Sequence, residues 1–401
     1  MFVAGIIAEY NPFHKGHAYH IQKTREMGAT HIVAVLGGDF TQRGDIALLS
    51  KHARAEAAVR CGADLVLELP CLWSMSTAGN FALGGVSVLK SLGVVDALSF
   101  GSERGEIAPL EAAADAAADS GLKPALDRFL AQGMTFAAAR QAAIAEQYGA
   151  ATAALFSEPN NTLGMEYIAA ARRLSADLRF FTVRRKGAAH DSLTKSAFLS
   201  AAAIRAKVAA GADPSASLPE PSAALLSEAI RAGETASLRR LETAILCKLK
   251  MMDKAVFAHL PDRSEGIENR LFSAVREAGT LDALCAAVKT KRYPMARVRR
   301  LILSAFLGLD DRFWLREVPY LRPLAFGPGG REILRAAREA AQKPIVYSVA
   351  DGMRMGGDVA AALSYEIKTA DLFNMATAAK RCEKNAYTTP IFKSMEETTW
   401  E

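Results

Sequence analysis

Residues 3–20 read VAGIIAEYNPFHKGHAYH, and this stretch decides the fold. The apolar run Val3–Ala8 predicts a buried strand, because it is short, apolar and followed at once by turn residues. Pro12 disfavours helical backbone at the residue before it, so the next helix can begin only after this turn. His14 and His17 are therefore expected at the carboxyl end of a strand, beside the amino end of a helix.

Such a position attracts phosphate. Unpaired N–H groups and the helix dipole face an anion there, and Gly16 lets the backbone approach it. Two imidazoles can donate hydrogen bonds to the oxygens of a phosphorus centre as its negative charge redistributes. The alternative is that His14 and His17 only cap the helix. His20 adds a third imidazole, but no carboxylate or thiolate at ligand spacing accompanies it, and no metal site is predicted.

Short apolar runs alternate with helical stretches through the first half of the chain. This alternation predicts right-handed βαβ units and a Rossmann-like parallel sheet, and hence an α/β fold class. Further strands are expected at His31–Leu36, Asp64–Leu69, Ala97–Phe100 and Phe180–Arg184. Helices are expected near His17–Met27, Lys51–Cys61, Ile107–Ala118 and Thr135–Glu146.

A Pro/Ser-rich stretch, Asp213–Ser222, ends this pattern and suits a linker or a surface loop. We predict a Rossmann-like first domain over residues 1–212 and a mainly helical second domain over residues 213–401. Beyond the linker, apolar residues recur three and four apart, which is typical of packed amphipathic helices. These helices are expected at Ala223–Ala232, Ser237–Met252, Leu281–Val288 and Ala296–Leu307, with Lys343–Val349 as a candidate strand.

Composition limits the class of protein. With 401 residues, half of them hydrophobic, the chain exceeds the size of a usual single core. Its 49 basic and 43 acidic residues permit an anionic partner such as nucleic acid without requiring one. Five cysteines without a CxxC pair favour a reducing cytoplasm. With neither a leader-like start nor a run of about 18 apolar residues, a soluble cytoplasmic protein without membrane contact is expected, and no protein partner is predicted.

Further segments carry groups suited to a nucleotide. The loop Gly37–Gly44 includes Arg43, which can hold a phosphate or a carboxylate; an ordinary turn with an exposed arginine is the alternative. The other candidates are Gly101 after a strand, Asn160 before a helix, Arg185 at a basic strand end, and Ser200 with Arg205 at a helix start. Helix caps and solvated turns are the alternatives for these. Gly327–Gly330 lacks the Lys and Ser/Thr of a phosphate-binding P-loop.

A basic cluster lies at the start of an expected helix in the second half. Six cations and one aromatic residue, Tyr293, fall within a dozen positions, a mixture that suits an RNA backbone and a stacked base. A solvated basic helix face is the alternative. The cations are Lys289, Lys291, Arg292, Arg297, Arg299 and Arg300.

In this order, the motifs resemble those of the HIGH-motif nucleotidylyltransferase superfamily, and specifically the bacterial tRNA(Met) cytidine acetate ligase family. The resemblance spans nearly the whole chain. It is carried by Gly5–His20, Gly37–Gly44, Arg54–Glu56, Gly62–Pro70, Ser99–Glu103, Pro159–Tyr167, Ser200–Arg205, Thr290–Tyr293, Arg299–Leu301 and Tyr387–Pro390.

The resemblance implies a two-step ligase. Acetate would be joined to AMP from ATP with release of pyrophosphate, and the acetyl group would pass to the exocyclic amine of the wobble cytidine in elongator methionine tRNA, forming 4-acetylcytidine. ATP is a substrate, and Mg²⁺ is expected with the triphosphate, although no protein ligand for it is identified.

Roles follow by position from the same resemblance. His14 and His17 would be catalytic at the α-phosphate, and Gly38, Asp39 and Arg43 would form a nearby substrate loop. The basic cluster would bind tRNA. ATP would be bound by Ile7, Ala8, Glu9, Tyr10, Asn11, Pro12, Phe13, His14, Lys15, Gly16, His17, His20, Gly101, Asn160, Arg185, Ser200 and Arg205.

Three positions depart from the family pattern. Asp39 stands where Asn is expected, which puts a negative charge near the supposed ATP. Ala202 replaces a Ser of the phosphate-tail motif and removes one hydrogen-bond donor. The segment Lys186–Asp191 is one residue shorter than the usual version.

Two other functions stay open from the residues themselves. One is a nucleotidylyltransferase that makes a dinucleotide-type cofactor from a small phosphorylated substrate, which would leave the basic cluster without a role. The other is a non-catalytic RNA-binding factor that retains ATP as a structural ligand, which the presence of both His14 and His17 disfavours.

Overall fold

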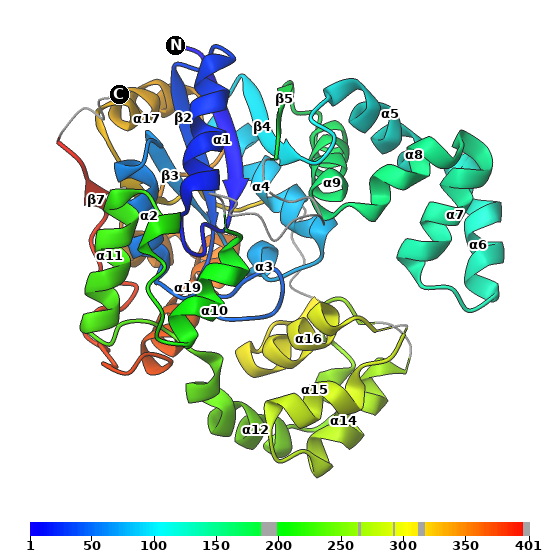
Figure 1. Ribbon diagram of the computed structural model, residues 1–401. Helices are drawn as coiled ribbons and strands as arrows, with labels where there is room; N and C mark the ends of the chain where they lie inside the picture. The colour runs from blue at the N-terminus through cyan, green and yellow to red at the C-terminus, as the bar shows by residue number, and fades with distance from the viewer. Residues whose placement is uncertain (186–198, 264–265, 292, 312–316, 396–401) are drawn as a thin grey trace.

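The computed structural model describes residues 1–185, 199–263, 266–291, 293–311 and 317–395, and its centre is a mixed sheet of seven strands (Figure 1). Their order across the sheet is β5-β4-β1-β2-β3-β6-β7. The first five in this order are mutually parallel, whereas β6 runs antiparallel to β3. The strands are β1 Val3–Ala8, β2 His31–Gly37, β3 Leu65–Leu69, β4 Ala97–Ser102, β5 Arg179–Arg184, β6 Pro323–Phe326 and β7 Phe392–Lys393.

The predicted parallel sheet and its α/β class are confirmed. Strand order reverses beside β1, which pairs with β2 on one side and with β4 on the other. In open parallel sheets a ligand crevice forms at the carboxyl ends of the strands at such a switch point. The segment that follows β1 therefore begins where a binding site is expected.

Helices cover both faces of the sheet, which explains why its central strands are mostly apolar along their whole length. Side chains of β1 alternate: Ala4 and Ile6 pack with α1 and α2, whereas Val3 and Ile7 pack on the opposite face, with α4 and α9. These flanking helices are α1 Lys15–Glu26, α2 Lys51–Arg60, α4 Ala78–Leu92, α9 Pro159–Arg173 and α17 Pro328–Ala340.

Two helical extensions project from this core (Figure 1). The first, here called the arm, is inserted between β4 and α9 and comprises α5 Ile107–Ala118, α6 Lys123–Ala131, α7 Phe136–Tyr148 and α8 Ala150–Ala154. The second, here called the helical lobe, comprises α12 Glu242–Met251, α13 Lys254–Phe257, α14 Ile267–Glu277, α15 Leu281–Val288 and α16 Met295–Leu307. The arm keeps a small core of its own around Ile144 and Leu122.

The predicted boundary at residue 213 does not separate two self-contained units. Strands β6 and β7 extend the first sheet, so part of the 213–401 segment returns to the N-terminal core. The Pro/Ser-rich stretch also packs against that core: Leu218 lies in one cluster with Leu48, and the Ser222 hydroxyl donates to the Phe13 carbonyl at 2.7 Å. The other helices of the 213–401 segment are α11 Glu220–Arg231, α18 Val349–Arg354 and α19 Gly357–Met375. Helix α10 Ala201–Ala209 precedes this segment, and α3 Cys71–Ser74 follows β3.

One strand prediction in this half is wrong. Lys343–Val349 forms only an isolated bridge between Ile345 and Leu321, and α18 begins at Val349. The strands of this half that do join the sheet are β6, which begins at a proline and spans four residues, and the two-residue β7. None of the described helices combines the length and the apolar composition that a membrane crossing requires.

Candidate active site

A cavity of about 700 Å³ opens at this switch point, beside β1. It lies among the carboxyl ends of β1, β4 and β5 and the amino ends of α1, α9 and α10. This volume suits a nucleotide-sized ligand. The structure brings together, on its wall, the predicted residues Ile7, Ala8, Glu9, Tyr10, Asn11, His14, Gly16, His17, His20, Arg43, Gly101, Asn160, Arg185, Ser200 and Arg205.

Five predicted residues do not line the cavity: Pro12, Phe13, Lys15, Gly38 and Asp39. Phe13 is buried beneath the site, where its ring packs edge-on against Tyr10. Lys15 is exposed at the first position of α1. Pro12, Phe13 and Lys15 belong to the segment around the histidines, and the prediction that they bind ATP is not supported by their positions. Gly38 and Asp39 were predicted in a substrate loop with Arg43, and of these three only Arg43 lines the cavity.

His14 and His17 form a stacked pair that is built into the start of α1. His14 is the N-cap, and its Nδ1 accepts the Gly16 N–H at 3.1 Å, while Nδ1 of His17 accepts the His14 N–H at 3.2 Å. The two rings stack with centroids 3.6 Å apart. Since both Nδ1 atoms accept hydrogen bonds, each neutral ring carries its proton on Nε2. Helix capping and a catalytic role are therefore compatible in these histidines. Nδ1 of each ring accepts a backbone N–H at the helix start, which leaves the N–H group at Nε2 to donate to a ligand.

Burial keeps these imidazoles neutral. Desolvation, reinforced by the nearby Arg185 guanidinium, lowers the pKa of both His14 and His20 to about 4, and it lowers the pKa of His17 well below its usual range. Nε2 of His20 shares a hydrogen bond of 3.0 Å with the Ser99 hydroxyl on β4. The site therefore presents uncharged N–H donors to an anion, with positive charge supplied by arginines.

These shifts predict a dependence of stability on pH. The pKa of His20 falls from 6.5 to about 4 on folding, so below pH 6.5 the unfolded chain binds more protons than the folded one. As far as His20 is concerned, the free energy of unfolding is therefore greatest above pH 6.5. Between pH 6.5 and pH 4 it falls by up to about 1.4 kcal/mol per pH unit. Urea unfolding from pH 7.5 to 4.5 should show a shallower decline for His20→Gln than for the unsubstituted chain, whereas parallel curves would contradict the shift.

Arginines frame the open side of the cavity. Arg185 follows β5, and its backbone N–H donates to the Ser102 carbonyl at 3.0 Å. Arg205 on α10 donates to the Asn11 carbonyl at 2.8 Å, so it holds the turn before the histidines as well as adding charge. Ser200 caps α10, as predicted from the sequence. The short Lys186–Asp191 segment lies outside the described residues.

The end of β4 is organised by two asparagines at the start of α9. The Asn160 side chain donates to Glu103 Oε1 at 2.5 Å. Asn161, which the sequence analysis did not single out, is fully buried, and its Oδ1 accepts the N–H groups of Glu103 and Arg104 at 3.0 and 3.1 Å. In the sequence, the only feature that points to Asn161 is its position next to Asn160, in an expected loop before a helix.

Arg54 supports the site from beneath. Its fully buried guanidinium donates to the carbonyl of Glu9 at 2.6 Å and to the carbonyls of Gly37 and Gly38 at 3.0 and 2.6 Å. It thereby links the ends of β1 and β2. Strand β1 leads to His14 and His17, and β2 leads into the loop Gly37–Gly44, here called the glycine loop. In the sequence, Arg54 stands out only as a member of the Arg54–Glu56 motif.

Asp39 points away from the cavity, which corrects the expectation that its charge lies near ATP. Its Oδ1 accepts the Lys51 N–H at 2.7 Å, and its carboxylate lies 4.0 Å from Arg54 and 3.9 Å from the Lys51 ammonium. Lys51 in turn bridges Glu68 at 2.5 Å and Glu366 at 2.6 Å, and all these side chains are buried. Asp39 therefore contributes negative charge that offsets the buried cations Lys51 and Arg54, beneath the loop Gly37–Gly44.

This placement gives a specific prediction for Asp39→Asn. The amide oxygen can still accept the Lys51 N–H, but the charge facing Lys51 and Arg54 is lost. The free energy of unfolding should fall by about 1–3 kcal/mol, while the dissociation constant for ATP changes less than about twofold. Urea unfolding and calorimetric ATP titration would test both parts. Unchanged stability together with tighter ATP binding would mean that the charge acts on the nucleotide.

The basic cluster divides into exposed and internal members. Lys289, Lys291 and Arg299 are exposed, and Arg292 lies outside the described residues. Arg300 is instead buried, with one nitrogen 2.6 Å from Asp262 and another donating to the Gln42 carbonyl at 3.2 Å. Arg297 also pairs with Asp262, at 3.4 Å. The surface that could meet RNA is therefore smaller than predicted.

Arg300 belongs to a contact between the helical lobe and the glycine loop. Gly44 has a φ of +71°, and a Cβ built there would lie 2.6 Å from the Arg300 backbone nitrogen and from Arg299 Cβ. Only glycine fits this close approach. Because Gln42 and Arg43 of the same loop line the cavity, the helical lobe rests directly on the cavity wall.

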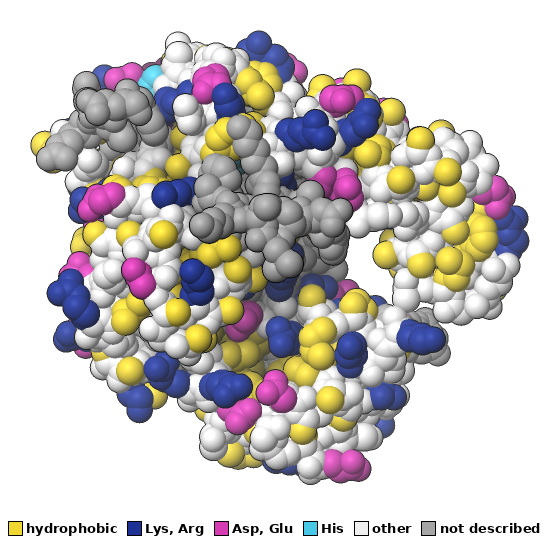
Figure 2. Space-filling model, in the orientation of Figure 1, with side chains coloured by type: hydrophobic (Ala, Val, Ile, Leu, Met, Phe, Trp, Pro, Cys, Tyr) yellow, Lys and Arg dark blue, Asp and Glu magenta, His cyan; other side chains and the backbone are white. Residues whose placement is uncertain are grey.

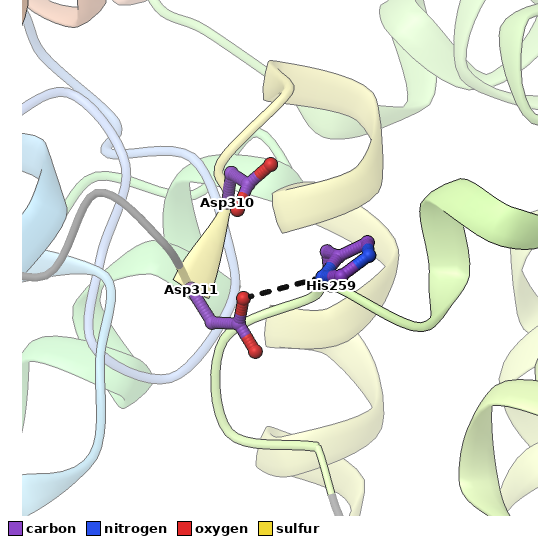
Figure 3. Close-up of side chains that lie close together, drawn as sticks. All are labelled: His259, Asp310 and Asp311. Carbon is purple, nitrogen blue, oxygen red and sulfur yellow. Dashed lines mark ion pairs between the residues drawn. The ribbon is translucent and has the colours of Figure 1, made fainter.

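A candidate metal-ligand group lies in the helical lobe, among the parts of the chain that the structure describes. His259, Asp310 and Asp311 offer ligand atoms within 4.8 Å of one another, and Figure 3 shows the Asp311 carboxylate facing the His259 ring. Asp311 is already paired with His259 at 3.6 Å and with Arg263 at 3.4 Å. None of the three lines the cavity, and we assign no metal to them.

Comparisons with known proteins agree on one group of relatives. The model of the HIGH Nucleotidyl Transferase family matches residues 1–388. The tRNA(Met) cytidine acetate ligase of Alkaliphilus metalliredigens is 33% identical over 98% of this chain and 99% of its own, and that of Caldicellulosiruptor bescii is 35% identical over 84% and 86%. The crystal structure of Thermotoga maritima TmcAL bound with alpha-thio ATP superposes with a TM-score of 0.91 at 29% identity, covering 99% of this chain and 100% of that one.

Proposed function

This chain belongs to the HIGH nucleotidyl transferase family, among the tRNA(Met) cytidine acetate ligases, and from this membership we propose that its cavity activates acetate with ATP and passes the acetyl group to tRNA. The observation that carries the proposal is the stacked, neutral His14–His17 pair on the cavity wall. Neither alternative function drawn from the residues finds support in these relatives, which share the name of an RNA-modifying ligase.

In the first step an acetate oxygen attacks the α-phosphorus of ATP. The new O–P bond forms acetyl-adenylate as the bond to the β-phosphate oxygen breaks and pyrophosphate leaves. The Nε2–H groups of His14 and His17 donate to the α-phosphate oxygens, which gain charge in the transition state. Neutral donors suit this role, because they stabilise the developing charge without binding the ground state as tightly as two cations.

The triphosphate is assigned to the basic side of the cavity. Arg185 and the amino end of α10, capped by Ser200, offer a guanidinium and unpaired N–H groups. Among the described lining residues Glu9 is the only carboxylate, and its Oε1 already accepts the Gln42 N–H at 2.7 Å. Mg²⁺ would therefore be held mainly by the phosphates and water, which is its usual preference in nucleotide sites.

In the second step the exocyclic amine of cytidine attacks the acetyl carbon. The new C–N bond forms as the bond to the AMP oxygen breaks, and one proton leaves the amine nitrogen. Holding the adenylate and the cytidine in one cavity supplies the proximity that the reaction needs, without a separate acyl carrier on the protein. Lys289, Lys291 and Arg299 are proposed to contact the RNA backbone beside the cavity.

Incorporation of labelled acetate into bulk bacterial tRNA tests this proposal. The chain is incubated with labelled acetate and tRNA, with and without ATP, and the nucleosides are separated by mass spectrometry. ATP-dependent 4-acetylcytidine is the expected product. ATP consumption on a small phosphorylated substrate, with no label in RNA, would instead support a cofactor nucleotidylyltransferase.

A further inference from the structure

Two aromatic rings and one guanidinium form a column that leads from the arm to the edge of the cavity. We propose that this column, Phe136–Arg140–Phe156, stacks an unpaired nucleobase of the RNA substrate, next to the cytidine that enters the cavity. The inference rests on the proposed function, which makes RNA a substrate. It adds a base-binding site on the arm, a part of the chain that the ATP site does not explain.

The column is a continuous arrangement. The Arg140 guanidinium carbon lies 5.8 Å from the centre of the Phe136 ring and 5.0 Å from that of Phe156. Glu166 on α9 orients the guanidinium through an ion pair of 3.2 Å. Nε of Arg140 is buried without a hydrogen-bond partner, so the arginine is held by its ring contacts and by this one ion pair.

The inner end of the column belongs to the cavity wall. Phe156 and Ser157 both line the cavity, in the short turn between the arm and α9. Gln141, next to Arg140 on α7, donates to the Ser157 hydroxyl at 2.7 Å, and the Thr162 hydroxyl donates to the Phe156 carbonyl at 3.2 Å. The arm is thus fastened to the cavity rim at the point where the column begins.

The outer end of the column is open to solvent. Phe136, the first residue of α7, is 59% exposed although its ring is among the largest apolar groups of the arm. In Figure 2 the arm stands off from the rest of the molecule across an open hollow, and Lys and Arg side chains gather on the helical lobe below it. A single-stranded segment that leaves the cavity at Phe156 and follows the column outward would meet the exposed ring of Phe136.

The chemistry of the column favours a nucleobase over other ligands. Stacking on aromatic rings and on a guanidinium plane is the usual way in which proteins hold unpaired bases, and it tolerates any base because each has a π face. A cytidine amine can react only when it is unpaired, so its neighbours in the strand are also accessible for stacking. With its target in the cavity, an adjacent base would reach the rim where Phe156 begins the column.

Phe136→Ala in the full chain tests the site. We expect the KM for tRNA in the acetylation reaction to rise about tenfold, because one stacked base is lost. Acetate-dependent exchange of pyrophosphate into ATP should stay within twofold, since Phe136 does not line the cavity. An RNA stem-loop with 2-aminopurine beside the target cytidine should be quenched on binding, and Phe136→Ala should abolish most of this quenching.

Two further variants control for the loss of an aromatic side chain as such. Phe136→Tyr retains a ring and should restore both KM and quenching. Tyr148→Ala removes an exposed aromatic residue, 41% accessible, from the other end of the same helix, and it should change neither value. Unchanged KM and quenching in Phe136→Ala would overturn the site while leaving the ligase function intact. Phe136-dependent quenching without any RNA acetylation would retain the site and overturn the function.

Discussion

His17→Gln should lower the rate of acetate-dependent pyrophosphate exchange by about 10²–10³. This is the usual effect of deleting one preorganised donor to a charge that develops in the transition state. The imidazole is positioned for this role by its stack on His14, by an edge contact with Tyr10 and by a tilted contact with Phe13. A glutamine whose amide oxygen accepts the His14 N–H cannot also place an N–H where Nε2 lies. Initial rates at saturating ATP and acetate would measure the loss.

Glutamine is the informative substitution because it separates catalysis from folding. His17 is the third residue of α1 and accepts the His14 N–H, a role that glutamine fills in ordinary capping boxes. The thermal midpoint of His17→Gln should therefore stay close to that of the unsubstituted chain. The matched variant His14→Asn preserves the N-cap in the same way and should show a similar loss of rate. Normal exchange rates in both variants would exclude the histidines from the chemistry.

Lys51→Met should lower the free energy of unfolding by about 3–5 kcal/mol, the usual cost of leaving buried charge unpaired. Lys51 is fully buried, and its ammonium bridges Glu68 at 2.5 Å and Glu366 at 2.6 Å. Without it these two carboxylates face each other in the core, and within the described residues only Glu68 has a second cationic partner, Arg322, at 3.4 Å. Urea unfolding at neutral pH would measure the change.

Two further variants show whether the loss of stability in Lys51→Met comes from the buried charges. Lys23→Met breaks an ion pair with Glu26 on the surface of α1 and should leave the free energy of unfolding nearly unchanged, because exposed ion pairs contribute little to stability. Adding Glu366→Gln to Lys51→Met removes one stranded charge and should recover part of the stability. If Lys51→Met were no more destabilising than Lys23→Met, the network would not hold α19 against the sheet.

Local sequence predicted a large part of the fold. The apolar runs at Val3–Ala8 and His31–Leu36 predicted strands that the structure confirms, because a strand buried on both faces is apolar at each position. Helix α1 begins at Lys15, two residues earlier than expected, because His14 is its N-cap. Two strands were missed: β6 begins at a proline and β7 has two residues, too short for any periodicity.

What the sequence by itself determined was the parallel sheet and the place of His14 and His17 at a strand end beside a helix start, because strand ends and helix starts are set by nearby residues. The family resemblance added Gly101, Asn160 and Arg185 to the same site, and the structure brings all three to one cavity with the histidines. Only the tertiary structure decided where charges are neutralised: Asp39 faces Lys51 and Arg54 instead of the nucleotide. It likewise turned Arg300 inward to Asp262, 38 residues earlier in the chain. Spacing along a sequence cannot reveal such pairs, because a buried charge is satisfied by whichever partner the fold brings beside it.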